Sequence, residues 1–567
     1  MLPLPTVFAL LLAGLSQVLA APPANLYWLQ LVVYAPALLA LSRLDGRRAV
    51  LGGWLFGLSA NAAIFSWLFR TVERFTTLGA AGGVGVLLLF AAAFGFYGAV
   101  FGWGAAAVRR ASGSLWPLGL AAWFVACEFL NPQLFPYLQG VAWYQVPSVF
   151  LVTALTGVSG VSFLLFAWNG LLAAGLERWL VARGRLEPMG EDSTLRRSGA
   201  LFAVLLVGAL AYAGLRGAAL ERVLTDAPTV RFALVQPNRD VAALNALNKE
   251  TKGGARADLL DLTRATLEAD PDIDVVMWAE GALRGNPLHR KRQAVLDLLA
   301  EHDVALWTGV VEGRGPREQR TRHNGAYRVQ PDGTLSPPYD KNILVPFGEF
   351  MPLAGLIPAL GRIRDFPSLT PGVEPAILSG PEAPPVGFLV CYEATRTRYV
   401  RHVAAAGAEV LGTVTYDGWF GDTAALDQHM MLAASMSALF GRPQVRAAAT
   451  GISMATGPDG VLLGRTERNQ RTALVVDVPM ATLDTPYRRW GDWLPWLCIL
   501  LGFGLAARGV PRAGPLAPGL FLLAAPLTWA INPHVPWPDK AVWTAAVLLA
   551  GVAWWMRRAV ASASTSG

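Results

Sequence analysis

Three residues in the middle of the sequence have types and settings that suit nucleophilic catalysis. Cys391 follows the apolar run GFLV, Glu280 ends the run VVMWAE, and Lys341 lies in the proline-flanked segment PPYDKNILVPFGEF. A thiol needs a base or a nearby cation to become a useful nucleophile. A carboxylate at the end of a buried strand is partly desolvated, which raises its pKa toward that of a general base. A positioned ammonium can stabilise an oxyanion.

Each of these residues also has a simpler explanation. A free cysteine is commonly a buried apolar residue, and we prefer that explanation for Cys127 and Cys498, which lie in hydrophobic segments. Glu280 taken alone could be a solvated loop carboxylate, and Lys341 taken alone could extend over an apolar surface. The three cysteines are odd in number and widely spaced, which argues against a disulfide framework, and no Cys-x-x-Cys pair indicates a zinc site.

The composition around these residues is that of an integral membrane protein. Of 567 residues, 53% are hydrophobic and 15% are charged, whereas soluble globular proteins carry about 25% charged residues. The length predicts more than one domain. The net charge of +7 comes mainly from arginine, which we attribute to membrane orientation and not to nucleic-acid binding.

Ten apolar segments are candidate membrane spans, because a spanning helix needs roughly 20 mostly apolar residues. They lie near 4–21, 26–42, 49–68, 79–107, 114–130, 148–176, 199–216, 493–507, 515–531 and 541–556. The first ends in SQVLAA, which resembles a signal-peptidase site, but no basic residue precedes it and we expect a retained helix. With a cytoplasmic N-terminus, the inside loops hold 14 arginines and the short outside loops hold three basic residues. The positive-inside rule then places the long segment between spans seven and eight outside the cytoplasm.

That long segment, 228–485, is expected to be a separate domain between membrane regions 1–220 and 490–567. It alternates short strands with amphipathic helices. The expected strands are 230–236, 274–280, 304–312, 387–393 and 408–416, and the expected helices are 257–269, 289–302, 394–407 and 425–441. Asp-Gly turns at 332–333 and 459–460 predict hairpins. The order predicts an α/β sandwich with two helical layers.

The order Glu280, Lys341, Cys391 resembles the Glu-Lys-Cys triad of the nitrilase (carbon–nitrogen hydrolase) superfamily. Finer motifs resemble the apolipoprotein N-acyltransferase family. They are YDKNILVPFGEFMP, VCYE, DGWFGD, QH, GRPQVRAAATGIS, GPDG and TPYRRWGDW, with FGLSANAAIFSWL, EFLNPQLFPYLQGVAWYQ and GVSGVSFLLFAWNG in the apolar part. The resemblance covers about residues 5–510. It implies a polytopic α-helical protein of the inner (cytoplasmic) membrane with an inserted, nitrilase-like αββα domain on the periplasmic or outer face.

The resemblance also implies a reaction. The family moves an acyl chain from a phospholipid to the N-terminal amine of a diacylglyceryl-cysteine lipoprotein in two ping-pong steps. Glu280 would take the thiol proton and Cys391 would attack the ester. Lys341 and the backbone N–H of Tyr392 would hold the oxyanion. No cofactor, metal or nucleic acid is expected, and we expect a monomer.

Further residues are assigned from the same resemblance. Glu349 matches a second family glutamate that orients the lysine or the base. Tyr392 and Glu393 match a pair beside the nucleophile, with structural support as the alternative. The candidates for lipid contact are Phe347, Phe350, Trp419, Phe420, Tyr144 and Glu128.

These lipid contacts have alternatives as well. The four aromatics at 347, 350, 419 and 420 could instead pack in the core. Glu128 is unusual because an ionisable group within a span is costly, yet it could simply hydrogen-bond a neighbouring helix. We interpret His429, on an expected helix, as structural.

Several positions depart from the family pattern. Ala279 and Gly281 flank the expected base, Tyr416 stands where an asparagine is usual, Asn131 stands where an arginine is frequent, and 238–250 lacks an expected tryptophan. The two last expected spans extend beyond the usual C-terminus. Besides lipoprotein N-acylation, a membrane-bound amidase of the nitrilase type, a paralogue with another acceptor and a non-enzymatic scaffold remain as hypotheses.

Overall fold

The computed structural model describes residues 1–75, 78–131, 133–189, 191, 193–239, 254–285, 287, 293–352 and 368–509. The chain divides into two compact units. The first contains Met1–Trp143, Thr156–Tyr212 and Asp492–Gly567, and the second contains Tyr144–Leu155 and Ala213–Gly491. The expected spans at 515–531 and 541–556 and most of 238–250 lie outside the described residues.

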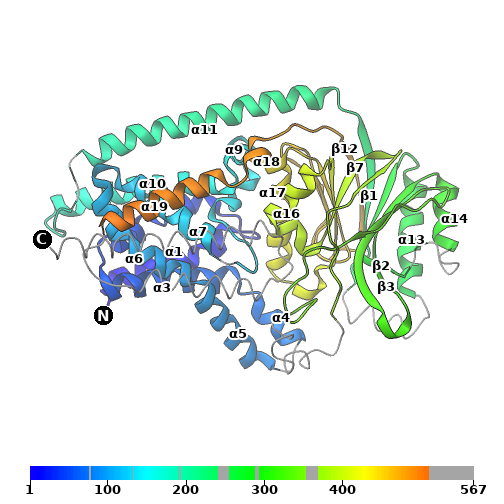
Figure 1. Ribbon diagram of the computed structural model, residues 1–567, viewed down its shortest axis with the longest axis horizontal. Helices are drawn as coiled ribbons and strands as arrows, with labels where there is room; N and C mark the ends of the chain where they lie inside the picture. Colours follow the sequence, from blue (N-terminus) through cyan, green and yellow to red (C-terminus); the bar gives the residue numbers. More distant parts are fainter. Residues whose placement is uncertain are drawn as a thin grey trace, which may run out of the picture. The chain divides into compact units, whose positions relative to one another are not determined.

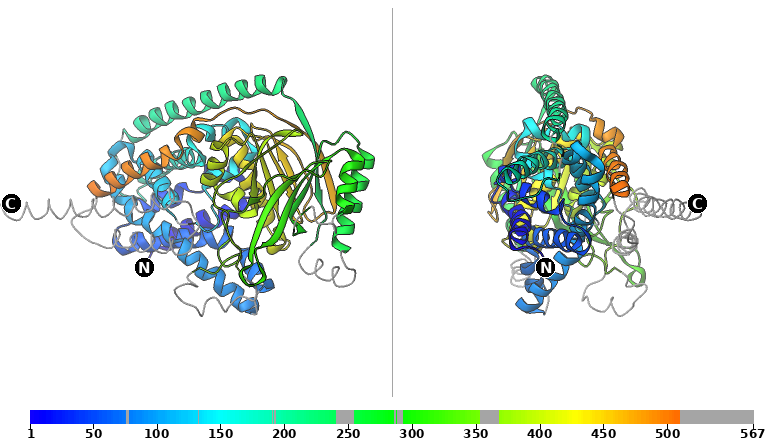
Figure 2. Two further views of the ribbon diagram at one scale, coloured as in Figure 1. Left: turned by 45° about the vertical axis from the view of Figure 1, so that its right-hand side comes forward. Right: turned by 90° about the vertical axis from the view of Figure 1, so that its left-hand side faces the viewer.

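The first unit is helical (Figure 2). Its helices are α1 (Leu4–Ala20), α2 (Ala35–Leu41), α3 (Gly46–Ile64), α4 (Leu68–Phe75), α5 (Gly79–Phe94), α6 (Phe96–Ser112), α7 (Trp116–Leu130), α10 (Val158–Ala182), most of α11 (Thr194–Thr225) and α19 (Trp493–Gly509). Three helical stretches in the described part of the chain are long and apolar enough to cross a membrane: Gly79–Leu130, Val158–Ala182 and Thr194–Thr225. A fourth is added if α3 and α4, bent by 56°, form one span. The total of ten spans therefore stays a prediction.

Four expected spans differ from the observed helices. The run 26–42 contains a 3₁₀ helix (Tyr27–Leu31) and the short helix α2, and in the run 49–68 helix α3 ends at Ile64. The run 79–107 is divided at Gly95 into α5 and α6. The run 148–176 begins with the short helices α8 (Pro147–Phe150) and α9 (Thr153–Thr156), and the long helix α10 starts only after Gly157, whose φ is +67°. Apolar composition did not reveal these breaks, because glycine leaves the hydropathy of a run almost unchanged. The positive φ of Gly157 is a conformation that glycine permits and that ends a helix, whereas Gly95 keeps a right-handed helical φ of −70°.

Glycines let α3 and α6 approach closely. A side chain at Gly53 would meet the carbonyl oxygen of Gly98, and one at Gly57 would meet that of Gly95, each at 2.0 Å. Helices that pack inside a membrane use small residues in this way because contact between backbones replaces the hydrophobic driving force.

The second unit contains two six-stranded sheets. One has the order β12-β1-β2-β3-β4-β5 and the other β11-β10-β9-β8-β7-β6. The strands are β1 (Thr229–Gln236), β2 (Val275–Arg284), β3 (Ala305–Arg314), β4 (Thr321–Val329), β5 (Tyr339–Asp340), β6 (Ile377–Gly380), β7 (Ala383–Val390), β8 (Val410–Thr415), β9 (Gln444–Ala448), β10 (Met454–Thr456), β11 (Leu462–Arg465) and β12 (Thr472–Pro479). Strands β1–β3 run parallel, as do β7–β9.

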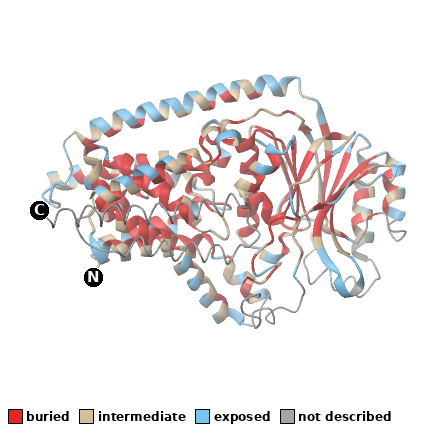
Figure 3. Cartoon of the chain, viewed as in Figure 1, coloured by how far each residue is buried: buried red, intermediate tan, exposed pale blue. Residues whose placement is uncertain are grey.

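The sheets pack face to face with helices outside them, as the alternation of strands and helices along the sequence predicts. Phe232 of β1 and Phe388 of β7 belong to one buried core shared by the two sheets. Ala233, the next residue of β1, points to the opposite face of its sheet and belongs to a second core with Leu259 of α13 (Gly254–Ala269) and Leu298 of α14 (Gln293–His302). Helices α16 (Thr397–Ala405) and α17 (Ala425–Phe440) lie on the other side (Figure 1), and both sheets are mostly buried (Figure 3). The predicted α/β sandwich with two helical layers is confirmed.

Candidate active site

The structure brings Glu280, Lys341 and Cys391 into one site in the second unit. Burial raises the pKa of Cys391, the Glu280 carboxylate raises it further, and the Lys341 ammonium lowers it. Burial likewise raises the pKa of Glu280, and Lys341 opposes that rise. Since each group acts electrostatically on the others, a carboxylate, an ammonium and a thiol lie together in one buried cluster.

Glu280 lies in β2 at an irregularity of the sheet. The pairing of β2 with β3 shifts register between Trp278 and Leu283, and Gly281 has a φ of +67°. Glycine after the expected base is therefore required by the backbone. The register shift re-aims the side chain at the site.

Two donors hold the Glu280 carboxylate in place. Asn324 Nδ2 donates to Oε1 at 2.6 Å, and the backbone N–H of Tyr416 donates to Oε2 at 2.8 Å. The second contact explains why a tyrosine can stand at position 416, since a main-chain donor does not depend on the side chain. The sequence interpretation missed Asn324, whose only signal is a polar residue in the expected hairpin strand.

Lys341 is fully buried and paired. Its Nζ donates to Glu349 Oε1 at 2.7 Å, and Lys341 is 1% exposed. Burial alone would lower the lysine pKa, but Glu349, Cys391 and Glu280 together raise it above its ordinary value. Glu349 Oε2 also accepts from the backbone N–H of Val345 at 2.7 Å, which fixes the carboxylate. The ammonium is thus charged and oriented.

Cys391 follows β7 in a left-handed backbone conformation. Its φ is +55°, although it is not a glycine, and the residue is 8% exposed. Such strain persists only where the surroundings hold it and is frequent at active sites. The raised thiol pKa means that the resting group is protonated, so a base must remove the proton before attack.

The neighbours of the nucleophile have different environments. Glu393 is completely buried and accepts from the Tyr339 hydroxyl at 2.6 Å, and from the backbone N–H groups of Val390, Asn342 and Ile343. It ties the lysine loop to the nucleophile strand, which favours structural support. The Tyr392 hydroxyl accepts from Arg396 at 3.3 Å, whose guanidinium also lies 5.5 Å from the ring centroid.

The aromatic candidates for lipid contact divide by exposure. Phe347 is 55% exposed and Trp419 is 42% exposed, whereas Phe350 is buried. The Phe420 ring lies 6.0 Å from the ring of His429. Phe347 and Trp419 are thus available for contact with an apolar ligand, and Phe350 adopts the packed alternative.

Glu128 and Tyr144 do not share an environment. Glu128, in α7 of the first unit, is 3% exposed and accepts from the backbone N–H of Gln139 at 2.6 Å. This is the alternative in which the carboxylate serves a neighbouring segment. Tyr144 belongs to the second unit and is buried, with its hydroxyl accepting from Gln145 Nε2 at 3.0 Å.

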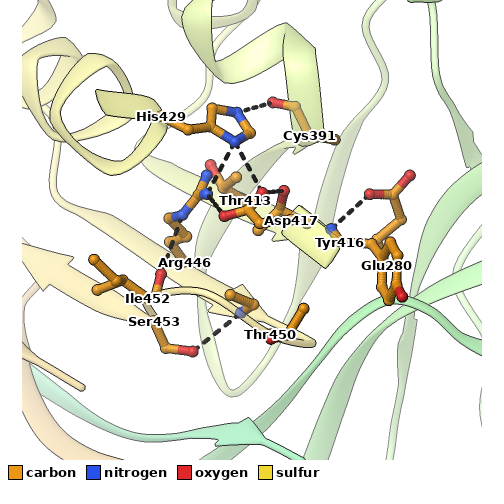
Figure 4. Close-up of polar contacts among 12 residues, drawn as sticks. Glu280, Cys391, Thr413, Tyr416, Asp417, His429, Arg446, Thr450, Ile452 and Ser453 are labelled. Atoms are coloured by element: carbon orange, nitrogen blue, oxygen red, sulfur yellow. Dashed lines mark hydrogen bonds and ion pairs between the residues drawn. The ribbon is translucent and has the colours of Figure 1, made fainter. Parts of the chain in front are cut away.

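A buried ionic network contacts the main chain of Cys391 through His429 (Figure 4). Asp417, which follows β8, accepts from Arg446 Nη2 at 2.6 Å and from Thr415 Oγ1 at 2.8 Å, and contacts His429 Nδ1 at 2.9 Å. One ligand atom each of Cys391, Asp417 and His429 lie within 4.8 Å of one another. The Arg446 guanidinium already pairs with Asp417. A metal cation bound to these three residues would lie beside that positive charge, so the set is unsuitable for a metal cation. The motifs DGWFGD, QH and GRPQVRAAATGIS contain these residues, but the sequence did not indicate that they meet.

Two family models and several known proteins are similar to this chain. A family model described as carbon-nitrogen hydrolase matches residues 233–487, and one described as apolipoprotein N-acyltransferase N-terminal domain matches residues 13–171. The apolipoprotein N-acyltransferase of Azotobacter vinelandii is 30% identical over 524 residues, covering 89% of this chain and 96% of that protein. That of Geobacter metallireducens is 28% identical over 501 residues, covering 86% and 92%. A solved amidase of the nitrilase superfamily from Nesterenkonia is 18% identical over 47% of this chain and 95% of its own, with a TM-score of 0.32.

Proposed function

The chain belongs to the apolipoprotein N-acyltransferase family, and from that membership we propose a reaction at Cys391. An acyl chain moves from a membrane phospholipid to the thiol, and then to the N-terminal α-amine of a diacylglyceryl-cysteine lipoprotein. The observation that carries the proposal is the buried Lys341–Glu349 pair, at 2.7 Å, in the electrostatic range of a strained cysteine and a desolvated glutamate. A buried lysine needs a partner anion, which Glu349 supplies, and the pairing keeps a charged ammonium close to Cys391.

In the first half-reaction the Cys391 thiol gives its proton to Glu280, and the sulfur attacks the ester carbonyl of the phospholipid. The negative charge that develops on the carbonyl oxygen is met by Lys341 and the backbone N–H of Tyr392. One such donor contributes about 10²–10³ in rate in other acyl-transfer enzymes. When the C–O bond breaks, Glu280 returns the proton to the leaving oxygen, and a lysophospholipid and a thioester result.

In the second half-reaction the lipoprotein amine attacks the thioester. Glu280 accepts a proton from the attacking nitrogen as the C–N bond forms. When the C–S bond breaks, the proton passes to the thiolate, and the resting thiol is restored. One carboxylate can serve both steps because burial raises its pKa above that of an ordinary carboxylate, which makes it a better proton acceptor.

The proposed location follows from the charge pattern. The predicted topology puts the domain 228–485 outside the cytoplasm, where a lipoprotein N-terminus and outer-leaflet phospholipids meet. Exposed Phe347 and Trp419 would contact acyl chains at the interface. We expect a monomer to be active, since Glu280, Lys341 and Cys391 all belong to the second unit of one chain.

Mass spectrometry of the purified full-length protein in phospholipid micelles tests the reaction. We expect an acyl adduct on Cys391 that is absent in Cys391→Ala and is transferred to a diacylglyceryl-cysteine peptide. Cys498→Ala is the matched control, because it removes another buried thiol outside the site. Absence of any adduct on Cys391 would refute the mechanism. An adduct that water removes as fast as the peptide does would instead indicate a hydrolase.

A further inference from the structure

The imidazole of His429 bridges a carboxylate and the main chain of the nucleophile. Its Nδ1 lies 2.9 Å from Asp417 Oδ1, and its Nε2 lies 3.3 Å from the carbonyl oxygen of Cys391 (Figure 4). The ring is 7% exposed, and both Asp417 and Arg446 are completely buried. The histidine therefore connects the ionic network to the residue that attacks the substrate.

The partners of the ring define its protonation. Nδ1 faces the Asp417 carboxylate oxygen at 2.9 Å and the Arg446 Nη2 donor at 3.3 Å, and Nε2 faces a carbonyl oxygen. A hydrogen on each ring nitrogen satisfies the two acceptors. Asp417 remains an anion: burial would raise its pKa, but Arg446 and His429 lower it to about 2. The imidazolium form satisfies both contacts, and Asp417 stands between two cations.

We propose that His429 is a positioning residue for Cys391. As an imidazolium it holds the peptide after Cys391 in the strained conformation and places a positive charge behind the sulfur that favours the thiolate. This inference rests on the proposed acyl transfer through Cys391 and assigns to it a group outside the Glu-Lys-Cys triad.

The peptide geometry explains the first effect. The carbonyl of Cys391 and the N–H of Tyr392 belong to one planar, trans unit and point in opposite directions. A donor that fixes the carbonyl also fixes the direction of that N–H. A left-handed φ of +55° at a non-glycine residue needs such external support.

Electrostatics explain the second effect. A ring nitrogen of His429 and the sulfur of Cys391 lie within 4.8 Å, a separation at which an opposite charge favours the ionised form. The charged groups that face the ring are Asp417 and Arg446. Those that act on the thiol are Glu280 and Asp417, which raise its pKa, and Lys341, which lowers it. With Asp417, Arg446 and an imidazolium all ionised, the network carries a net positive charge.

Two variants separate the effects. His429→Gln keeps an amide donor that can reach the Cys391 carbonyl but loses the charge, and His429→Ala loses both. Ser437→Ala is the matched control, because Ser437 lies on the same helix and its buried hydroxyl contacts Thr456 at 2.6 Å without touching the site. The readouts are the rate of acyl-adduct formation from phospholipid between pH 6 and pH 9, and thermal unfolding.

We expect His429→Ala to form the adduct at least about tenfold more slowly at pH 7, which corresponds to one pKa unit of the thiol, and to recover partly as pH rises. His429→Gln should lie between His429→Ala and the wild type, with its pH profile also displaced upward. If the His429→Ala rate falls only as much as that of Ser437→Ala, or if neither histidine variant displaces the profile, His429 is structural and the inference is wrong. A wild-type protein that forms no adduct would instead refute the proposed function.

Discussion

Replacing Glu349 with glutamine tests whether an oriented, charged lysine is needed at the site. The glutamate accepts from Lys341 Nζ with one oxygen and from the Val345 N–H with the other, both at 2.7 Å. Glutamine has the same shape but only one acceptor oxygen. Whichever way the amide is turned, its NH₂ group faces one of the two donors, so either the ammonium or the loop N–H loses its partner.

The size of the effect follows from the contact that is lost. A hydrogen bond to a charged group contributes about 1.5–3 kcal/mol, and about 1.4 kcal/mol corresponds to a factor of ten in rate. We therefore expect Glu349→Gln to slow adduct formation about 10- to 150-fold. Loss of the negative charge also lowers the pKa of Lys341, which Glu349 raises, and that of Glu280, which Glu349 raises too. Both limbs of the pH–rate profile should move to lower pH.

Single-turnover mass spectrometry of the adduct, measured across pH, provides the assay. The matched control is Glu382→Gln, which breaks the buried pair between Arg328 Nη2 and Glu382 Oε1, at 2.6 Å, just before β7 and at the opposite end of that strand from Cys391. This variant should lose stability but keep the wild-type pH profile. If Glu349→Gln reacts within twofold of the wild type, or if the two variants lose rate equally with unchanged profiles, the reasoning about Lys341 is refuted.

Three further predictions concern neighbouring residues. Asn324→Ala removes a donor that favours the ionised form of Glu280, so the acid limb of the pH–rate profile should move up by about one to two units; an unmoved limb would exclude Glu280 as the base. Glu393→Gln cannot accept from all four donors that surround the carboxylate, so it should lower the free energy of unfolding by about 1–3 kcal/mol in denaturant titrations, whereas a role in chemistry alone would leave stability unchanged. Cys127→Ala and Cys498→Ala should keep adduct formation, and loss of the adduct in either would contradict the assignment of Cys391.

Much of the second unit could be predicted because its residues alternate in hydrophobicity. The strands β1, β2, β3, β7 and β8 lie where short apolar runs predicted them, and α16 ends before Gly407 as expected. In such segments the period of apolar residues reflects which face is buried, and it is a local property. The breaks at Gly95 and Gly157 were missed, because a uniformly apolar run has no period to interrupt.

The sequence by itself determined which residue types could do the chemistry and in which order they occur. It predicted Glu280 and Cys391 at the ends of strands and Lys341 in a stiffened loop, from neighbours along the chain. Cys391 does follow β7, whereas the end of the strand at Glu280 was wrong, because β2 continues through a register shift to Arg284. Only the tertiary structure decided which distant groups act on them. Asn324, the Tyr416 N–H and His429 reach the site from other elements, and nothing local in the sequence specifies contacts across two sheets, since these depend on register, strand order and the positive φ of Cys391.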